Sequence, residues 1–522
     1  MTRLTWMCCA LLLSLTAACD PTQTGEPPAD GGHVGTPDAG MPRAPTVLSF
    51  TATPVALPYG GGDVTLSWQA ADATGLSIEP GIGPVSGSAR TVSVATSTRF
   101  TLTARNEAGS ATAETAVAVD TRTAVSGKVV DVTGHPLPNV LVTPLDGSGA
   151  FASTDLEGEF QLASVSPPYD LALVANNAKV ATVYVGLTRD RVTLTQFNQS
   201  ASHGSATLHG TISGGQPPYA SDGTNAPMVF FSAPGGTDSL EASPDGPTAY
   251  FTGAFFWQAM FGQTSVTGTL YALQPVRSAP GAIPSRYAGF GQRDNVTLTA
   301  GTHVFNIDLA MGSVGNSTLG GHVGVPNGYA LSSTAVFAAF RPEGVASLFR
   351  DPLPTATFSY PVPNLPRARF SLYATATSRT GATAYGIRAG LSAGSTSALG
   401  LQDTPHPARP FDRAAGITRA TPFVWSPYAG GVHLLELWST SHPSYQLVVV
   451  TADNAAVLPD LSRFGMGLPA DASFQWRVEG VAPFASVDAL VDGPRLPRLL
   501  SLLADGTCGS SELRSFTTAA SP

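Results

Sequence analysis

The chain has 522 residues, a formal net charge of −9 and only 12% charged residues. Because it contains no long basic run, it lacks the electrostatic footprint of a nucleic-acid-binding protein, and we expect no nucleic-acid partner. The length exceeds what one hydrophobic core supports, and 55 glycines and 43 prolines favour several small modules with many short strands and turns.

The first 18 residues have the layout of an export signal. Arg3 precedes an apolar run from Leu4 to Leu15, and small residues follow that run. About a dozen apolar residues are too few to span a bilayer core, which needs roughly 20. We therefore predict a signal peptide over residues 1–18 and no permanent transmembrane helix.

The end of this segment, Thr16-Ala17-Ala18-Cys19, resembles the lipobox of bacterial lipoproteins at its last three positions, whereas Thr16 stands where Leu is usual. The resemblance implies lipidation of Cys19 and a membrane partner through this N-terminal lipid anchor. It also implies a location in the cell envelope, with the outer membrane or cell surface favoured over the inner membrane. The alternative is an ordinary secretory signal that leaves Cys19 as a thiol.

The cysteines provide no disulfide framework. Cys8 and Cys9 leave with the signal and Cys19 is taken by lipid, so Cys508 has no intramolecular partner. We expect Cys508 to be a small buried side chain. Residues 19–45 hold the lipidated cysteine and then almost no aliphatic side chain, which predicts a disordered linker.

Residues 46–120 alternate apolar and polar positions in runs separated by turn signals, as the strands of a β-sandwich do. This segment resembles bacterial immunoglobulin-like domains, with Trp68 as the core tryptophan and a hairpin at 106–109. The alternative for Trp68 is an exposed ring that stacks on a ligand. The predicted strands are 64–70, 90–96, 99–106 and 111–119.

Residues 121–200 carry two glycine-containing turn motifs, at 133–136 and 155–158, and Phe160 follows the second. The segment resembles the carboxypeptidase regulatory-like, transthyretin-like β-sandwich, which implies support or binding rather than chemistry. We predict a hairpin at each turn and an inward-pointing Phe160. Asp155, Glu157 and Glu159 could ligate calcium, but a turn is favoured because the loop lacks further oxygen ligands at the required spacing.

Residues 201–404 resemble a diverged internal duplication, since four blocks match in the same order. We expect one β-sandwich repeat over 201–315 and a second over 316–404. Their opening strands faintly resemble that of the preceding module, which suggests three related sandwiches in tandem. The matched blocks are 205–213 with 316–324, 229–236 with 336–344, 268–274 with 369–376, and 296–301 with 389–394.

The first repeat contains the aromatic cluster Tyr250, Phe251, Phe255, Phe256 and Trp257. One interpretation makes Trp257, Phe255 and Tyr250 a ligand-binding set that stacks on sugar rings or another apolar partner. The other is a buried strand, because Phe251 and Phe255 have the same parity and so share one face.

The C-terminal residues 405–522 carry, in this order, Trp425, Tyr445, Trp476, Val478 and Phe516. This order resembles that of a fibronectin type III domain, whose second strand carries a Trp, whose middle strand follows a Tyr and whose last strand ends near Phe-Thr-Thr. Residues 496–503 are expected to form a short helix or an inserted loop.

The sequence contains no nucleophile elbow, zinc-binding helix, phosphate loop or dinucleotide fingerprint, and its histidines form no pair at helical spacing. We therefore expect no catalytic residues, metal or cofactor. The predicted fold class is all-β, with tandem β-sandwich domains (immunoglobulin-like, transthyretin-like and fibronectin type III-like) after the signal peptide and linker.

Three functional hypotheses follow. The first is a lipid-anchored, non-enzymatic cell-envelope protein that acts as an adhesive, scaffold or spacer, with an envelope protein or polysaccharide as its partner. The second is a carbohydrate- or polymer-binding surface lipoprotein. The third is an enzyme whose site lies in residues 201–404 and has no recognisable motif.

Overall fold

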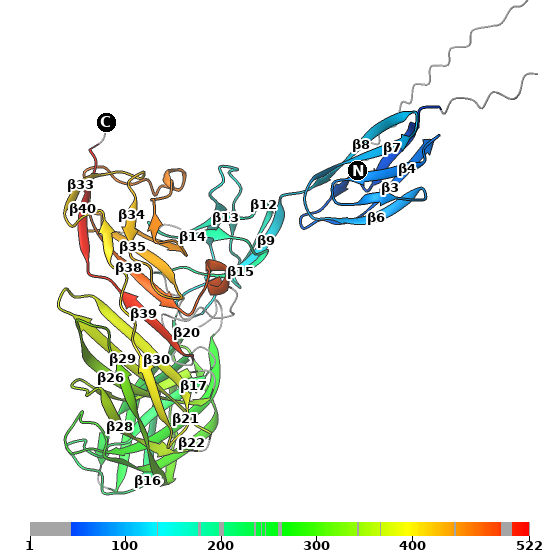
Figure 1. The fold of residues 1–522 in the computed structure, drawn as a ribbon. Coiled ribbons are helices and arrows are strands. Elements are labelled where there is room, and N and C mark those ends of the chain that lie inside the picture. Colours follow the sequence, from blue (N-terminus) through cyan, green and yellow to red (C-terminus); the bar gives the residue numbers. More distant parts are fainter. Residues whose placement is uncertain are drawn as a thin grey trace, which may run out of the picture. The chain divides into compact units, whose positions relative to one another are not determined.

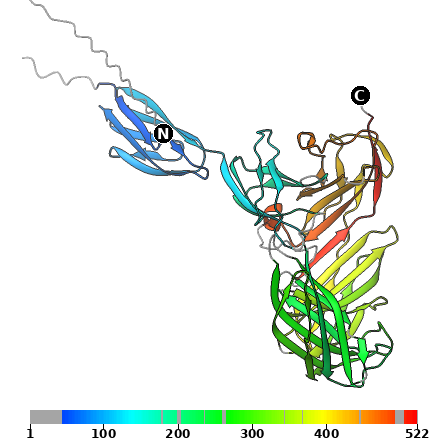
Figure 2. The same ribbon diagram turned by 180° about the vertical axis from the view of Figure 1, so that it is seen from behind.

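The structure is a computed structural model, which Figures 1 and 2 show from opposite sides. It describes residues 43–520 except 133, 176–178, 198–202, 234–235, 242, 246, 259–263, 342–343, 366, 443–444 and 492–503. The described chain is built of strands, with one short helix, α1 (Val487–Val491), and one 3-10 turn (Ser462–Phe464). The all-β, tandem-sandwich prediction is confirmed. No helix among the described residues is long and apolar enough to cross a membrane.

The chain divides into two compact units: the first holds residues up to Val55 and Asp63–Ala118, and the second holds Ala56–Gly62 and Val119 onward. The first unit packs the sheet β1-β3-β6 against strands β8, β7, β4 and β5. Its predicted core tryptophan, Trp68, is buried. The strands up to residue 119 are β1 (Thr46–Thr53), β2 (Ala56–Leu57), β3 (Gly62–Ala71), β4 (Gly75–Glu79), β5 (Gly83–Val85), β6 (Ala89–Val94), β7 (Thr98–Asn106) and β8 (Gly109–Val119).

The predicted hairpin between β7 and β8 is present. Asn106 pairs with Gly109, and the Asn106 carboxamide oxygen accepts hydrogen bonds from the amides of Ala108 and Gly109. A short polar side chain that bonds its own backbone two residues on is the usual device of such turns.

The second unit begins with three sandwiches that repeat one strand-pairing pattern. In sandwich 1 (residues 123–195) the central strand β9 pairs antiparallel with β12 and parallel with β15, and a second sheet follows the order β11-β10-β13-β14. Its strands are β9 (Thr123–Val130), β10 (Val140–Pro144), β11 (Ala152–Ser153), β12 (Glu159–Val165), β13 (Tyr169–Ala175), β14 (Val180–Leu187) and β15 (Arg191–Thr195).

Sandwich 2 (residues 203–313) has the same arrangement, with β16 pairing with β20 and with β23 and β24, and with the order β18-β17-β21-β22 in its other sheet. Its strands are β16 (His203–Gly214), β17 (Met228–Ala233), β18 (Gly236–Glu241), β19 (Ser243–Asp245), β20 (Thr248–Gln258), β21 (Ser265–Val276), β22 (Arg286–Thr299), β23 (His303–Val304) and β24 (Leu309–Ser313).

Sandwich 3 (residues 315–400) repeats the pattern again, with β25 between β28 and β31 and with the order β27-β26-β29-β30. Its strands are β25 (Gly315–Gly324), β26 (Tyr329–Arg341), β27 (Gly344–Asp351), β28 (Thr357–Asn364), β29 (Arg369–Ser378), β30 (Thr383–Leu391) and β31 (Thr396–Gly400). The matched sequence blocks therefore occupy equivalent strands in sandwiches 2 and 3, and sandwich 1 shares their topology.

The two hairpins predicted in sandwich 1 do not extend beyond their turns: Val130 forms an antiparallel bridge with Pro136 across the first, but β9 and β10, and likewise β11 and β12, lie in different sheets. The turns themselves exist, since the Gly134 amide donates to the carbonyl of Asp131 and the Gly158 amide donates to that of Asp155; Thr133 lies outside the described residues. Each turn, however, leads from one sheet to the other, because β9 pairs with β12 and β15 rather than with β10. Local turn chemistry fixes where the chain reverses but not which strand becomes the hydrogen-bonding neighbour.

The carboxylate of Asp155 stabilises the second turn. Its Oδ1 accepts hydrogen bonds from the amides of Glu157 and Glu159, at 3.1 and 2.7 Å. This is the local bonding typical of an Asx turn. Phe160, which follows the turn, points into the core as predicted.

A glycine faces a phenylalanine at the same place in the small sheet of all three sandwiches. The pairs are Gly127 with Phe160, Gly210 with Phe251, and Gly321 with Phe358. A Cβ at each glycine would lie 2.7–2.9 Å from the ring and would overlap a backbone carbonyl oxygen of an adjacent segment. The ring covers the glycine backbone, so each position requires glycine because of this close approach.

The C-terminal module (residues 407–518) supplies strands that extend the sheets of sandwiches 1 and 3. The five residues that follow the fibronectin type III order, Trp425, Tyr445, Trp476, Val478 and Phe516, are all buried. Its strands are β32 (Pro407–Arg409), β33 (Ala414–Ile417), β34 (Phe423–Trp425), β35 (Val432–Ser439), β36 (Gln446–Thr451), β37 (Ala455–Ala456), β38 (Ser473–Ala482), β39 (Gly506–Ser510) and β40 (Arg514–Thr518). The segment predicted as helix or loop, 496–503, lies outside the described residues.

Two seams join this module to its neighbours by backbone hydrogen bonds. Strand β36 pairs parallel with β14 of sandwich 1, and β39 pairs antiparallel with β30 of sandwich 3. The result is one 14-stranded sheet shared by all three parts, visible in Figure 1 where the red β39 lies beside the yellow β30. Edges that would otherwise expose unpaired backbone groups are thereby closed.

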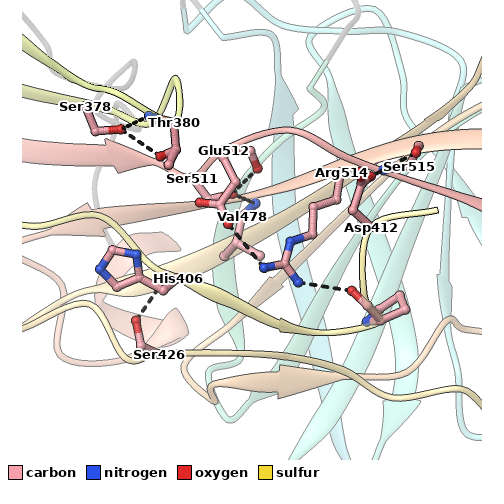
Figure 3. A network of polar contacts seen from close by, with 11 residues as sticks. Ser378, Thr380, His406, Asp412, Ser426, Val478, Ser511, Glu512, Arg514 and Ser515 are labelled. Carbon is pink, nitrogen blue, oxygen red and sulfur yellow. Dashed lines mark hydrogen bonds and ion pairs between the residues drawn. The ribbon is translucent and has the colours of Figure 1, made fainter. Parts of the chain in front are cut away.

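The last strand is fixed by a polar network, which Figure 3 shows. The Arg514 guanidinium pairs with Glu512 at 3.2 Å and donates to the carbonyl oxygen of Pro410, while the amide and hydroxyl of Ser515 donate to Asp412. These bonds connect β40 to the loop between β32 and β33. The C-terminal strand is thus held to the module by side chains as well as by the sheet.

Sandwiches 2 and 3 share an aromatic core. Rings from sandwich 2, Phe230, Tyr271 and Phe290, lie against Phe340 of sandwich 3, and the Tyr271 and Phe340 centroids are 4.7 Å apart. Buried stacked rings contribute beyond their area alone. This contact joins the two repeats through side chains.

A buried carboxyl lies beside the seam between β39 and β30. Glu479 on β38 accepts a hydrogen bond from the thiol of Cys508 at 2.9 Å, and Cys508 pairs across the seam with Tyr385. Cys508 is buried, as predicted. Burial, with a smaller effect of the nearby Glu436 carboxylate, raises the pKa of Glu479 to about 7, and burial also raises the pKa of the Cys508 thiol.

The first prediction concerns the glycine of sandwich 2. Gly210→Ala should lower the free energy of unfolding by about 1–3 kcal/mol, because the added methyl group overpacks against Phe251 and a carbonyl oxygen. Urea unfolding of the full chain measures this change. The control is Gly312→Ala in β24, where a Cβ meets nothing within 4 Å; equal effects of the two substitutions would contradict the proposed cause.

The stability of the fold should depend on pH through the buried Glu479 carboxyl. Because the folded-state pKa of Glu479 lies above its ordinary value, its contribution to stability is present at low pH and is lost as pH rises through about 7. The thermal midpoint should therefore fall between about pH 5 and pH 8. Glu479→Gln should remove most of this fall, as followed by differential scanning fluorimetry. An unchanged pH profile in the variant would show that other groups cause it.

Candidate ligand-binding face

The structure separates the residues predicted to bind a ligand. Tyr250 is 53% exposed, whereas Phe255 is fully buried beside Phe251 in the core of sandwich 2. This corrects the expectation that Phe255 takes part in a ligand surface, since strand alternation turns it to the opposite face from Tyr250. The side chain of Trp257 and the predicted lipidation residue Cys19 lie outside the described residues.

Tyr250 lies on the outer face of the small sheet of sandwich 2. Side chains alternate between the two faces of β16, so His209 points outward while Leu208 and Ile212 are buried. On β20, Thr252 is the cross-strand partner of His209 and points outward beside it. Strand β23 runs parallel to β16 and adds the exposed His303, with Phe305 shortly after it. Phe305 is 60% exposed, a large apolar area in water.

Three of these rings form one stacked group. The centroids of His209 and Phe305 are 4.4 Å apart with an interplanar angle of 10°, and those of His209 and His303 are 5.6 Å apart at 23°. The third pair, His303 and Phe305, is 6.1 Å apart at 18°. The outer face therefore carries a cluster of nearly parallel rings rather than scattered aromatic residues.

Hydrogen bonds fix the polar atoms around the rings. His209 Nδ1 lies 3.1 Å from the Thr252 hydroxyl, and His209 Nε2 lies 3.3 Å from His303 Nδ1. Beside them, the Thr211 hydroxyl donates to the Asp308 carboxylate at 2.6 Å. The face, here defined as Tyr250, Thr252, His209, His303 and Phe305, thus combines apolar ring surface with positioned polar groups.

The equivalent faces of the other two sandwiches provide an internal comparison. The position of His209, directly before the glycine that all three sandwiches share, is Ser126 in sandwich 1 and Gly320 in sandwich 3. The position of Tyr250, directly before the paired phenylalanine, is Glu159 and Thr357 respectively. Because the same scaffold presents small or polar residues twice and aromatic residues once, packing does not require the aromatic residues of sandwich 2.

Sequence reasoning missed most of this face. His303 and Phe305 lie 94 or more residues beyond His209 and come beside it only because β23 pairs in parallel with β16. No local motif marks such a pairing. Tyr250 was the one residue of this face named from the sequence, and its place in β20 turns it to the outer face.

A separate groove of about 530 Å³ lies over the seam between sandwich 1 and the C-terminal module. Its walls are mainly aliphatic and include Val183, Val449 and Val457, and three aspartates line it. Two of the aspartates have clear partners: Asp170 accepts from the Gly186 amide, and Asp460 pairs with Arg419 at 2.8 Å. The groove offers apolar surface, but its charges are largely satisfied within the protein.

No family model matches this chain, and no curated protein matches it. Among solved structures, it is similar to the Bacillus anthracis TIE protein, with 9% identity over 67% of this chain and 74% of that one and a TM-score of 0.20. A fimbrial assembly protein from Parabacteroides distasonis has 10% identity over 38% and 92% of the two chains, with a TM-score of 0.16.

A calcium-stabilised adhesin by which an Antarctic bacterium binds ice has 12% identity over 67% of this chain and all of that one, with a TM-score of 0.12. TM-scores this low do not carry an argument about function.

Proposed function

We propose that this chain is a non-enzymatic adhesive scaffold of the bacterial cell envelope, anchored by lipid on Cys19. The observation that carries the proposal is the outer face of sandwich 2, where Tyr250 and Phe305 expose large apolar side chains that the equivalent faces lack. Contiguous exposed apolar surface rimmed by polar groups marks interaction sites on soluble proteins.

The joined sheets support the scaffold part of the proposal. Sandwich 1, the C-terminal module and sandwich 3 share continuous backbone hydrogen bonds through the seams at β14–β36 and β39–β30. Strands paired along their length resist sliding because many bonds must break together. A protein that carries force from a ligand to a membrane anchor gains from such connections.

A second candidate function, carbohydrate or polymer binding, is favoured by the chemistry of the same face. Sugar rings present apolar faces that stack on aromatic side chains, and their hydroxyl groups bond to imidazole and threonine groups. Phe305 and Tyr250 would supply the stacking surface, and Thr252 and His303 the polar contacts. Envelope polysaccharide is then the partner of the adhesive scaffold.

The test compares binding of the full chain to a glycan array and to purified cell-wall polysaccharide. Replacing both Tyr250 and Phe305 by Ala should weaken binding at least about fivefold, since each stacked ring contributes about 0.5–1.5 kcal/mol. The matched control replaces Thr357 and Thr396, exposed residues of the equivalent face in sandwich 3, by Ala. This control should bind like the parent.

Equal binding of the parent and the Tyr250/Phe305 variant would contradict the role of this face. Turnover by the full chain on peptide, ester or glycoside panels would contradict the non-enzymatic assignment and favour an enzyme. For the anchor, the mature N-terminal peptide should carry acyl chains on Cys19 by mass spectrometry, and a free thiol there would contradict it.

A further inference from the structure

A hollow of about 440 Å³ lies over the small sheet of sandwich 1. It spans the strands β12, β9 and β15, and its polar lining consists of Lys128, Glu159, Arg191, Ser126 and Thr193. A volume of this size lies within the range of small-ligand sites. The hollow belongs to a different sandwich from the aromatic face described above.

Strand register brings the three charged side chains to one face of the sheet. Glu159 is the antiparallel partner of Lys128, and Lys128 pairs in parallel with the position two residues after Arg191. Lys128 and Arg191 are therefore diagonal neighbours on adjacent strands, at a spacing of about 7–8 Å that two long side chains can bridge. Phe160 and Val192, which alternate with these residues, are buried, so the charged side chains lie on the solvent side.

The charges that line the hollow do not cancel. Within the part of the chain that the structure describes, no ion pair includes Lys128, Arg191 or Glu159. Two cations accompany one carboxylate, so the lining is net positive in a chain whose formal net charge is −9. Such a site attracts an anionic group, and an arginine binds a carboxylate through two parallel hydrogen bonds.

One wall of the hollow comes from the C-terminal module. Val491, the last residue of α1, lines the hollow and is buried together with Val487 and Leu490. The helix is fixed to sandwich 1 by Asp488, whose carboxylate accepts hydrogen bonds from the amide and the hydroxyl of Thr188, at 3.0 and 2.5 Å. Sandwich 1 and the C-terminal module therefore form the hollow together.

We propose that this hollow binds a uronic acid, a sugar that carries one carboxylate on a ring of hydroxyl groups. The sugar carboxylate pairs with Arg191 and Lys128, and the ring hydroxyl groups donate to Glu159 and Thr193. Glu159 selects against a dense polyanion, because an ionised carboxylate accepts hydrogen bonds from neutral hydroxyl groups but repels further negative charge.

The equivalent positions of the other sandwiches lack this charge pattern. Lys128 directly follows the glycine that all three sandwiches share, and this position is Thr211 in sandwich 2 and His322 in sandwich 3. Arg191 is the parallel partner of the residue before that glycine, and Thr396 takes its place in sandwich 3. The scaffold folds without these charges, so packing does not require them. The site is independent of the adhesive role proposed for sandwich 2.

The experiment is isothermal titration calorimetry of the full chain with tetragalacturonate, at low salt because salt screens exposed charges. The parent should bind this probe but neither its methyl ester, in which the carboxylates are blocked, nor the neutral sugar maltotetraose. Arg191→Gln and Lys128→Gln should each weaken binding about fivefold, the loss expected for one exposed charge pair. The matched control is Arg90→Gln, which removes an exposed arginine from β6 of the first unit and should bind like the parent.

Circular dichroism and thermal unfolding of each variant check that the fold is kept. The proposal is overturned if Arg191→Gln and Lys128→Gln bind like the parent, if Arg90→Gln loses as much affinity as they do, or if the parent does not bind the probe. Inorganic phosphate binding as tightly as tetragalacturonate would show an unselective anion site and would overturn the assignment to a sugar acid. If the Tyr250/Phe305 variant keeps the adhesive activity while tetragalacturonate binding depends on Arg191, the face of sandwich 2 loses its role and this site remains.

Discussion

The second unit depends on edge-to-edge strand pairing between modules. The five residue pairs that join Val180–Tyr184 to Gln446–Val450 in parallel, and those that join Thr383–Ile387 to Gly506–Ser510 antiparallel, make the C-terminal module part of the sheets of its neighbours. Backbone pairing does not depend on which side chains the strands carry, but it does fix their register. A slip by one residue would turn every side chain in the seam to the opposite face of the sheet. Within the C-terminal module, the hydrogen bond from the Cys508 thiol on β39 to Glu479 on β38 joins the seam strand β39 to its inner neighbour.

Within each sandwich the inner and outer faces of the small sheet follow different constraints. Inside, a glycine lies under a phenylalanine ring at the same place three times, because no side chain fits between the ring and the adjacent carbonyl. Outside, the exposed side chains can differ at little cost to the fold. On the outer face of sandwich 2, imidazole and aromatic rings occupy these variable positions, and the adhesive proposal rests on them.

Much of the fold could be predicted from the sequence, because alternation and turn residues act locally. Four strands of the first unit (β3, β6, β7 and β8), the burial of Trp68 and the duplication within residues 201–404 leave local or repeated signals, whereas β1, β4 and β5 were not predicted. The choice of hydrogen-bonding neighbour for each strand leaves no such signal in the sequence. The turns at 133–136 and 155–158 were recognisable, yet the chain crosses between sheets there, and the parallel pairing that brings His303 beside His209 has no local signature. Because side chains alternate between the two faces of β20, Phe255 points into the core and Tyr250 into solvent.

The central claim is that sandwich 1, sandwich 3 and the C-terminal module behave as one cooperative structure because they share a sheet. Differential scanning calorimetry of the full chain tests this most directly, since the cooperativity of the parent is itself the readout. The second unit should unfold in a single transition whose calorimetric and van't Hoff enthalpies agree. Separate transitions for these three parts would contradict the account.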